Sequence, residues 1–348
     1  MANIKLSNFF TRLTNWEYWP LYITNIPLFF FWMWFAIRAR HPFFFSAVNP
    51  VIETGGLFGE SKYNILKRLP ESHRPVTLFI KKNTPVLSIL SEMKRAGLFF
   101  PIIAKPDVGE RGLLVSKIST QKELEKYTRE NKIDFLVQQY ISLPLELAVM
   151  HHRLPGEKKG RITSVCIKKT LKIKGDGKST VRQLMEKEDR ARLQLARFEK
   201  YFPDVLGRIP PLGKSLELEP IGNHCRGTLF LNGNGHIDEK LNEVFDRVAF
   251  QMKDIYYGRF DMKCTSMESL KKTGRFMVLE YNGVGAEPAH IYDPAYPVYK
   301  KYRDIFRHWK IIFHIYKIQK RKGVKSMTAK EVLWRFKKYS KYRSMVNH

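Results

Sequence analysis

Two short stretches in the C-terminal half of the sequence combine acidic, amide and basic side chains in spacings that suit phosphate and metal chemistry. In the first, Arg259, Asp261 and Lys263 recur at every second position, so a strand would present all three on one face. In the second, Glu280 and Asn282 alternate with apolar residues. Paired as a hairpin, the stretches would bring two carboxylates and an amide oxygen together, and such hard oxygen ligands suit Mg2+ with phosphate. The alternative is a solvated polar face on an edge hairpin.

The chain is strongly basic, and its excess charge is concentrated at the C-terminal end. Its 348 residues, enough for two or three domains, include 61 Lys and Arg against 33 Asp and Glu, a net charge of +28. Residues 300–348 hold 16 of the basic residues and two acidic ones. This balance favours a polyanionic partner: a nucleic acid, an anionic membrane surface or a phosphorylated substrate. The three cysteines form no CxxC pair, which disfavours a zinc or disulfide framework and favours a reducing compartment.

Residues 21–37 form an apolar, aromatic stretch with Trp19 before it and Arg38 after it, flanks that are typical of a membrane interface. The stretch is slightly short for a membrane span and is interrupted by Pro27. No small-residue cleavage site follows, so a signal peptide fits poorly. Three interpretations stay open: an interfacial or re-entrant helix, a single tilted span, or a helix buried in a soluble core or an oligomer interface. The basic tail would add electrostatic attachment to anionic lipid, about 1 kcal/mol per cation.

The middle of the chain is predicted to form strands and helices, with polar residues at the ends of several strands. Lys105 stands near the end of an apolar stretch, and the turn that follows, with Gly109 and Gly112, could fold over phosphates. Glu146 follows another strand, where it either accepts ribose hydroxyls or is a surface charge. Strands are predicted at 75–80, 99–107, 113–118, 134–141, 161–174 and 228–231, and helices at 64–69, 84–98, 121–131 and 181–200.

Three polar loops and a capping signal complete this pattern. Residues 49–62 contain three glycines that would let backbone approach a ligand, or they form a flexible turn region. Residues 175–180, Gly-Asp-Gly-Lys-Ser-Thr, predict a turn, and the loop 222–227 carries His224 and Arg226, which could touch an anionic substrate. Thr328 and the glutamate three residues later predict a capping box that opens a C-terminal helix.

Taken in order, these segments resemble the ATP-grasp superfamily of carboxylate–amine ligases, nearest to the D-alanine–D-alanine ligases and the ligase half of the cyanophycin synthetases. The resemblance covers roughly residues 75–297, and its specificity lies in the order and spacing of several motifs. It is carried by residues 100–107, the turn up to Gly112, residues 137–141 with Glu146, the turn 175–180, and the stretches 258–261 and 279–282.

The resemblance implies roles for the residues that match. Arg259, Lys105 and Arg226 are the expected catalytic residues, Arg259 as the cation that stabilises the transferred phosphate. Asp261, Glu280 and Asn282 are the expected ligands of Mg2+, for which Mn2+ would substitute. The ATP site is expected to consist of Lys105, Gly109, Arg111, Gly112, Gln138, Gln139, Tyr140, Ile141 and Glu146.

The predicted fold is therefore α+β: an ATP-grasp fold of two subdomains that grip ATP, with a shortened N-terminal region carrying a hydrophobic helix and a basic helical tail. The expected divisions are a hydrophobic segment at 1–45, a substrate-side region at 46–83, the grasp domain at 84–297 and the tail at 298–348. That shortened N-terminal region departs from the family pattern, so no substrate identity is implied.

The expected activity is ATP- and Mg2+-dependent joining of a carboxylate to an amine through an acyl phosphate. It would act at the cytoplasmic side of a membrane, or in the cytoplasm if the hydrophobic segment is buried in protein. The substrate would be lipid-linked or anionic. The alternatives are a phosphotransferase with the same fold, and a degenerate grasp domain that binds nucleic acid or anionic lipid. Nucleic acid is the less favoured partner, and a homo-oligomer is left open.

Overall fold

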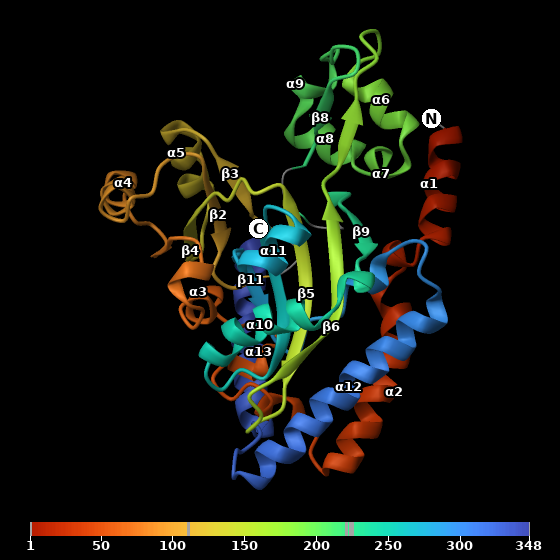
Figure 1. The fold of residues 1–348 in the computed structure, drawn as a ribbon. Helices are drawn as coiled ribbons and strands as arrows, with labels where there is room; N and C mark the ends of the chain where they lie inside the picture. The colour runs from red at the N-terminus through yellow and green to blue at the C-terminus, as the bar shows by residue number, and fades with distance from the viewer. Residues whose placement is uncertain (1, 110–111, 220–221, 223–225, 348) are drawn as a thin grey trace.

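The computed structural model describes residues 2–109, 112–219, 222 and 226–347, and it has the predicted α+β architecture with antiparallel sheets (Figure 1). The smaller main sheet has the strand order β1-β4-β2-β3, and the larger has the order β11-β10-β5-β6-β9. Their strands are β1 (Thr77–Ile80), β2 (Ile102–Pro106), β3 (Ser116–Ile118), β4 (Phe135–Gln139), β5 (Leu145–Arg153), β6 (Gly160–Lys169), β9 (Leu229–Asn232), β10 (Tyr257–Cys264) and β11 (Met277–Asn282).

Helices α4 (Val86–Arg95) and α5 (Gln121–Glu130) pack on the smaller sheet because each has an apolar side. Ile89 of α4 and Leu124 of α5 are fully buried in this core. Thr120 caps α5 by accepting a hydrogen bond from a backbone N–H of its first turn. The predicted strands and helices of residues 75–141 are thus confirmed, each shorter than expected. The helix predicted from residue 84 begins only after Pro85, which is the N-cap of α4.

The larger sheet is built around β5, which pairs with β10 on one side and β6 on the other. Helices α10 (Glu239–Gln251) and α11 (Met267–Thr273) cover it, and the rings of Phe245 and Phe276 stack with their centroids 5.1 Å apart in the core. No strand was predicted from the sequence at β5. Residues 147–150 of this strand are all apolar and two histidines follow them. A short apolar run of this kind has no periodicity that would distinguish a buried strand from a helix.

A small unit follows β6, seen at the top of Figure 1. It contains β7 (Lys172–Lys174), β8 (Ser215–Glu217), α6 (Val181–Lys187), α7 (Asp189–Arg192), α8 (Leu195–Tyr201) and α9 (Pro203–Leu206). The predicted single helix at 181–200 is wrong, because Glu188 is extended and the run divides into three helices. Arg190 pairs with Glu17 and Arg192 bonds Asn8, so tertiary contacts with the N-terminal segment accompany the break.

Helices α2 (Leu21–Ala39) and α12 (Val298–Arg321) lie side by side next to the larger sheet (Figure 1). The other terminal helices lie apart from this pair: α1 (Ala2–Thr14) contacts α7, and α13 (Ala329–Asn347) forms the C-terminal end. Phe35 of α2 is buried against Phe313 of α12, whereas Phe30 and Trp34 of α2 are exposed. Within the described part of the chain, no helix is both long enough and apolar enough to cross a membrane. The capping box before α13 is confirmed by reciprocal hydrogen bonds between Thr328 and Glu331.

Buried Asn49 fixes the segment that connects α2 to the smaller sheet. Its amide nitrogen donates to the carbonyls of Gly55 and Tyr257, and its oxygen accepts from the backbone N–H groups of Tyr256 and Tyr257. This segment therefore lies beside β10 and the end of β11. The remaining short elements are α3 (Lys62–Leu66) and the 3-10 turns η1 (Trp16–Tyr18), η2 (Phe44–Ala47), η3 (Glu53–Gly55), η4 (Glu71–His73), η6 (Asn234–His236) and η7 (Ala289–Tyr292).

Candidate active site

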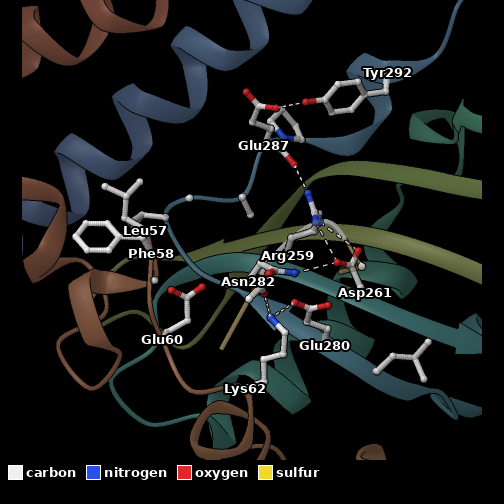
Figure 2. Close-up of a pocket in the computed structure, with 18 of the residues that line it drawn as sticks. Leu57, Phe58, Glu60, Lys62, Arg259, Asp261, Glu280, Asn282, Glu287 and Tyr292 are labelled. Carbon is white, nitrogen blue, oxygen red and sulfur yellow. Dashed lines mark hydrogen bonds and ion pairs between the residues drawn. The ribbon is translucent and has the colours of Figure 1, made fainter. Parts of the chain in front are cut away.

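The predicted hairpin is formed by β10 and β11, and its polar faces converge as the spacing indicated. Arg259 lies opposite Asn282, and Asp261 lies opposite Glu280, with a register shift directly after Asp261. These residues line a cavity of about 990 Å3 between the two main sheets, which Figure 2 shows in close-up. Asp261 is only 7% exposed. The alternative of a solvated polar face is therefore wrong.

Asp261 is held by three donors. Arg259 forks onto it, with Nε 3.2 Å from Oδ1 and Nη2 3.0 Å from Oδ2. Asn282 donates its amide N–H to Oδ2 at 2.9 Å, and Lys168 of β6 lies 3.2 Å from Oδ1. Burial alone would raise the pKa of Asp261, but the cations of Arg259 and Lys168 hold that pKa below its usual value. Asp261 is therefore a carboxylate at neutral pH.

Glu280 is paired with a lysine that comes from far away in the sequence. The Lys62 amine lies 2.8 Å from Oε1 of Glu280 and also donates to the Gly109 carbonyl at 2.6 Å. Burial acts against both charges, yet the pairing raises the pKa of Lys62, and Lys62 with Lys105 lowers the pKa of Glu280. The contact joins the first residue of α3 to the glycine turn and to β11, as Figure 2 shows for Lys62 and Glu280.

The donor set at this hairpin fits Mg2+ bound together with phosphate. Asp261, Glu280 and the amide oxygen of Asn282 supply two carboxylates and one neutral oxygen, the number of protein ligands that Mg2+ commonly takes beside phosphate and water. In the described residues no cluster of three His, Cys, Asp or Glu side chains offers a fuller metal site. Lys62 and Lys168 balance the two carboxylates in this structure.

Lys105 of β2 reaches the same cavity from the smaller sheet. Its amine donates to Oε1 of Gln138 at 3.0 Å and to the carbonyl of Leu279 at 2.9 Å, so it joins the two sheets next to Glu280. Burial lowers the pKa of Lys105 to about 8, the nearby Lys62 cation acts in the same direction, and Glu280 partly opposes the shift. Gly109 and Gly112 line the cavity beside it. Arg111, expected in the ATP site, lies outside the described residues.

The lowered pKa of Lys105 leads to a test of its expected contact with nucleotide phosphate. Lys105 carries its charge below pH 8 and loses it as the pH rises through about 8, where its amine titrates. Affinity for ATP is then expected to fall about tenfold between pH 7.5 and 9.0, measured by calorimetric titration with Mg2+ present. Lys105→Arg keeps its charge over this range, and its affinity should stay flat. A steep fall in both proteins would contradict the assignment.

Glu146, at the start of β5, is buried in the cavity wall, so the alternative that it is a surface charge is wrong. Its carboxylate lies 3.3 Å from the amine of Lys168 and 3.9 Å from that of Lys263. Lys168 thus bridges Glu146 and Asp261, and these carboxylates raise its pKa although burial opposes them. The expected adenine-binding residues Gln138, Gln139, Tyr140 and Ile141 also line the cavity.

Arg226 is not among the residues that line the cavity, and its contact with substrate stays a prediction. Its guanidinium donates to the carbonyls of Gly112 and Val115 and lies 3.6 Å from the Glu219 carboxylate. It therefore braces the turn between β2 and β3, and the cavity is lined by other described residues. His224, singled out in the same loop, lies outside the described residues.

Two cations and three acids of this cavity were not predicted from the sequence: Lys62, Lys168, Glu17, Glu60 and Glu287. Lys168 follows a mostly apolar run and is itself followed by Lys169, so period-2 reasoning could not say which lysine faces inward. Glu287 places its backbone carbonyl 3.0 Å from Nη1 of Arg259, and its carboxylate accepts a hydrogen bond from Tyr292 (Figure 2). Contacts of this kind depend on tertiary structure and leave no local signal.

The architecture settles the fold. Two α+β subdomains, each with an antiparallel sheet, close on one cavity lined by the strand lysine, the glycine turn and the acidic hairpin. This is the arrangement that the resemblance to the ATP-grasp superfamily implied. The predicted α+β class, with two subdomains around one cavity, is thus confirmed.

Solved structures that resemble this chain include several ligases. They include the VanG D-Ala:D-Ser ligase from Enterococcus faecalis, at 12% identity over 75% of this chain and 63% of that one, with a TM-score of 0.43. A D-alanine–D-alanine ligase from Bacillus anthracis complexed with ATP gives 15% identity over 76% and 68%, with a TM-score of 0.41. A bifunctional glutathione synthetase from Pasteurella multocida gives 14% over 76% and 36%, with a TM-score of 0.38. No family model and no curated protein matches the sequence.

These likenesses are weak, with TM-scores below 0.5, and they concern the fold alone. The chain also spans less than two thirds of the VanG ligase, 63% of its length. The function of this chain therefore depends on the residues of its own cavity.

Proposed function

We propose that the protein is an ATP- and Mg2+-dependent ligase that joins a carboxylate to an amine through an acyl phosphate. The observation that carries this proposal is the hairpin cluster itself, in which Asp261, Glu280 and Asn282 converge beside Arg259 in a buried cavity. Three lysines, Lys62, Lys105 and Lys168, line the same cavity. Bound nucleotide phosphates require a metal ion and fixed positive charges around them. The cluster supplies oxygen ligands for the metal ion, and the lysines supply the fixed positive charges.

The chemistry needs no side-chain nucleophile. The substrate carboxylate attacks the γ-phosphorus, a new O–P bond forms, and ADP leaves with the electrons of the broken bond. The amine then attacks the acyl carbon, loses a proton and expels phosphate. Mg2+, held by Asp261, Glu280 and Asn282, would neutralise phosphate charge when bound.

The chain's own part in this reaction is positioning and charge. Arg259, fixed by its fork onto Asp261, would hold the transferred phosphoryl group in line between the two oxygens. Lys105 and Lys168 supply positive charge in a site largely closed to water, where each charge counts for more than at a surface. The glycine turn with Gly109 and Gly112 would shield the acyl phosphate from hydrolysis.

The place of action in this proposal is an anionic membrane surface, on its cytoplasmic side, with a lipid-linked or anionic substrate. Exposed aromatic side chains on α2, among them Phe30 and Trp34, support an interfacial position. The basic tail supports electrostatic attachment, since residues 300–348 hold 16 Lys and Arg and only two acidic residues.

The experiment is to follow ADP release in the presence of hydroxylamine, with Mg2+, ATP and a panel of carboxylic acids. Hydroxylamine captures an acyl phosphate as a hydroxamate, so a hydroxamate formed together with ADP supports the ligase. ADP formed with a stable phosphorylated alcohol would instead identify a phosphotransferase. If no acid or alcohol stimulates ADP release, the catalytic proposal fails and the fold serves binding alone.

A further inference from the structure

The active-site cavity continues past the hairpin into a region between α2 and α12. Leu28, Phe29 and Trp32 of α2 line it at helical spacing, and Ile305, Trp309 and Ile312 of α12 line it in the same way. The whole space, about 990 Å3, lies at the upper end of the range of about 300–1,000 Å3 that is usual for small-molecule sites. It is therefore large enough for a nucleotide and a second ligand together.

Helices α2 and α12 touch each other through different side chains from the ones that line this region. Their contact is made by Phe31 on Phe306, with ring centroids 5.0 Å apart, and by Phe35 on Phe313, at 5.2 Å. The indole N–H of Trp32, its one polar group, donates a hydrogen bond to the Pro42 carbonyl at 3.0 Å. The two helices also place Thr24 and His308 in the lining, and a ring nitrogen of His308 bonds the Tyr257 hydroxyl at 2.9 Å. The other lining side chains of α2 and α12 offer aromatic and aliphatic surface to a ligand.

The region opens towards solvent along α2. Phe29 lines the cavity and is also 54% exposed, so it stands at the mouth. The neighbouring Phe30 and Trp34 are exposed as well, and Arg38 and Arg40 follow at the end of the helix. An apolar surface thus leads from outside the protein to the polar reaction site.

We propose that this apolar end binds the hydrocarbon chain of an amphiphilic substrate, whose reacting carboxylate or amine points to Arg259. The identity of the reacting group rests on the proposed function; binding of the chain does not. A polar substrate would lose its water here without gaining hydrogen bonds, whereas each methylene buried on apolar walls tightens binding about fourfold. Affinity should therefore rise steeply with chain length.

The test uses octanoate, decanoate and dodecanoate, each below its aggregation concentration, titrated into the full-length protein by calorimetry without ATP. We expect affinity to rise about sixteenfold for each two carbons. Phe29→Asp should lower dodecanoate affinity at least tenfold. Phe30→Asp, on the same helix with a similar exposure of 56% and not among the cavity-lining residues, should change it less than twofold. Equal ATP affinity in both variants shows that each is folded.

Two results would overturn the inference: affinity that is independent of chain length, or an equal loss in the two variants. The readout also separates this inference from the proposed function. Chain-length-dependent binding that Phe29→Asp removes, in a protein that never releases ADP, would uphold the apolar site and sink the ligase. Hydroxamate formed from short acids alone, at rates that Phe29→Asp does not change, would uphold the ligase and sink the apolar site.

Discussion

Glu280→Gln is expected to slow substrate-dependent ADP release about 1,000-fold, equivalent to about 4 kcal/mol of transition-state stabilisation. Glu280 lies directly opposite Asp261 in the hairpin and is one of only two carboxylates in the expected Mg2+ site. Its glutamine variant keeps the shape and one oxygen but loses the charge. The apparent Mg2+ requirement should rise with the loss of rate, because a neutral amide binds a hard cation less tightly.

The measurement is ADP release at increasing Mg2+ for the wild type, for Glu280→Gln and for Glu268→Gln. Glu268 makes a good control because it lies in the connection between β10 and β11 yet is exposed. Glu280→Gln also frees Lys62 from its pair, so Lys62→Met is measured in parallel. A smaller defect in Lys62→Met than in Glu280→Gln assigns the effect to the carboxylate. Undiminished turnover in Glu280→Gln would contradict the metal assignment.

The cavity carries nearly balanced charge without nucleotide, which explains how so many ionised groups are buried together. Each acid of the hairpin has a cation within 3.2 Å: Arg259 and Lys168 at Asp261, and Lys62 at Glu280. Breaking one such pair leaves an uncompensated buried charge, which costs about 3–5 kcal/mol. When ATP binds, Mg2+ would replace the cations as the partner of the two carboxylates, and the phosphates would become the partners of the cations. The site is therefore suited to bind ATP together with its metal ion.

The sequence predicted the hairpin cluster well because strand periodicity is local. Side chains alternate between the two faces of a strand, so every second residue shares a face. This rule alone placed Arg259 with Asp261 and Glu280 with Asn282. The partners of these residues were beyond such reasoning. Lys62 reaches Glu280 from more than 200 positions away, through a segment that Asn49 fixes to β10. Nothing in the local pattern of residues 49–62 encodes that meeting.

The N-terminal helix shows a second limit. Composition gave residues 21–37 an apolar character without saying which side would be covered. The structure buries Phe35 against α12 and leaves Phe30 exposed, a division that depends on where α12 lies. Arg226 illustrates the same point, because it donates hydrogen bonds to the carbonyls of Gly112 and Val115, which no local pattern indicated. Long polar side chains reach several alternative partners, and only the fold selects one.

Arg259→Lys is expected to lower the rate of ADP release at least 1,000-fold while changing ATP affinity only about threefold. The guanidinium makes three directed contacts, two to Asp261 and one to the Glu287 carbonyl, and an ammonium group cannot reproduce this fork. An arginine that stabilises the transferred phosphoryl group typically contributes 10³–10⁵ in rate. The loss should thus appear in the chemical step and not in binding.

Single-turnover ADP formation and calorimetric ATP binding separate these two effects. Arg247→Lys, on the exposed side of α10, provides the matched control and should behave as the wild type. Arg259→Ala gives a sharper test, because added guanidinium ion should restore part of its rate if the side chain acts on the reacting phosphate. If Arg259 only holds Asp261 in place, its loss should instead weaken Mg2+ and ATP binding and lower the melting temperature. Guanidinium ion should then not restore the rate. Lys168 still pairs with Asp261 in either variant, so the hairpin should keep its fold. A difference in rate between these variants and the wild type then reports on the chemical step.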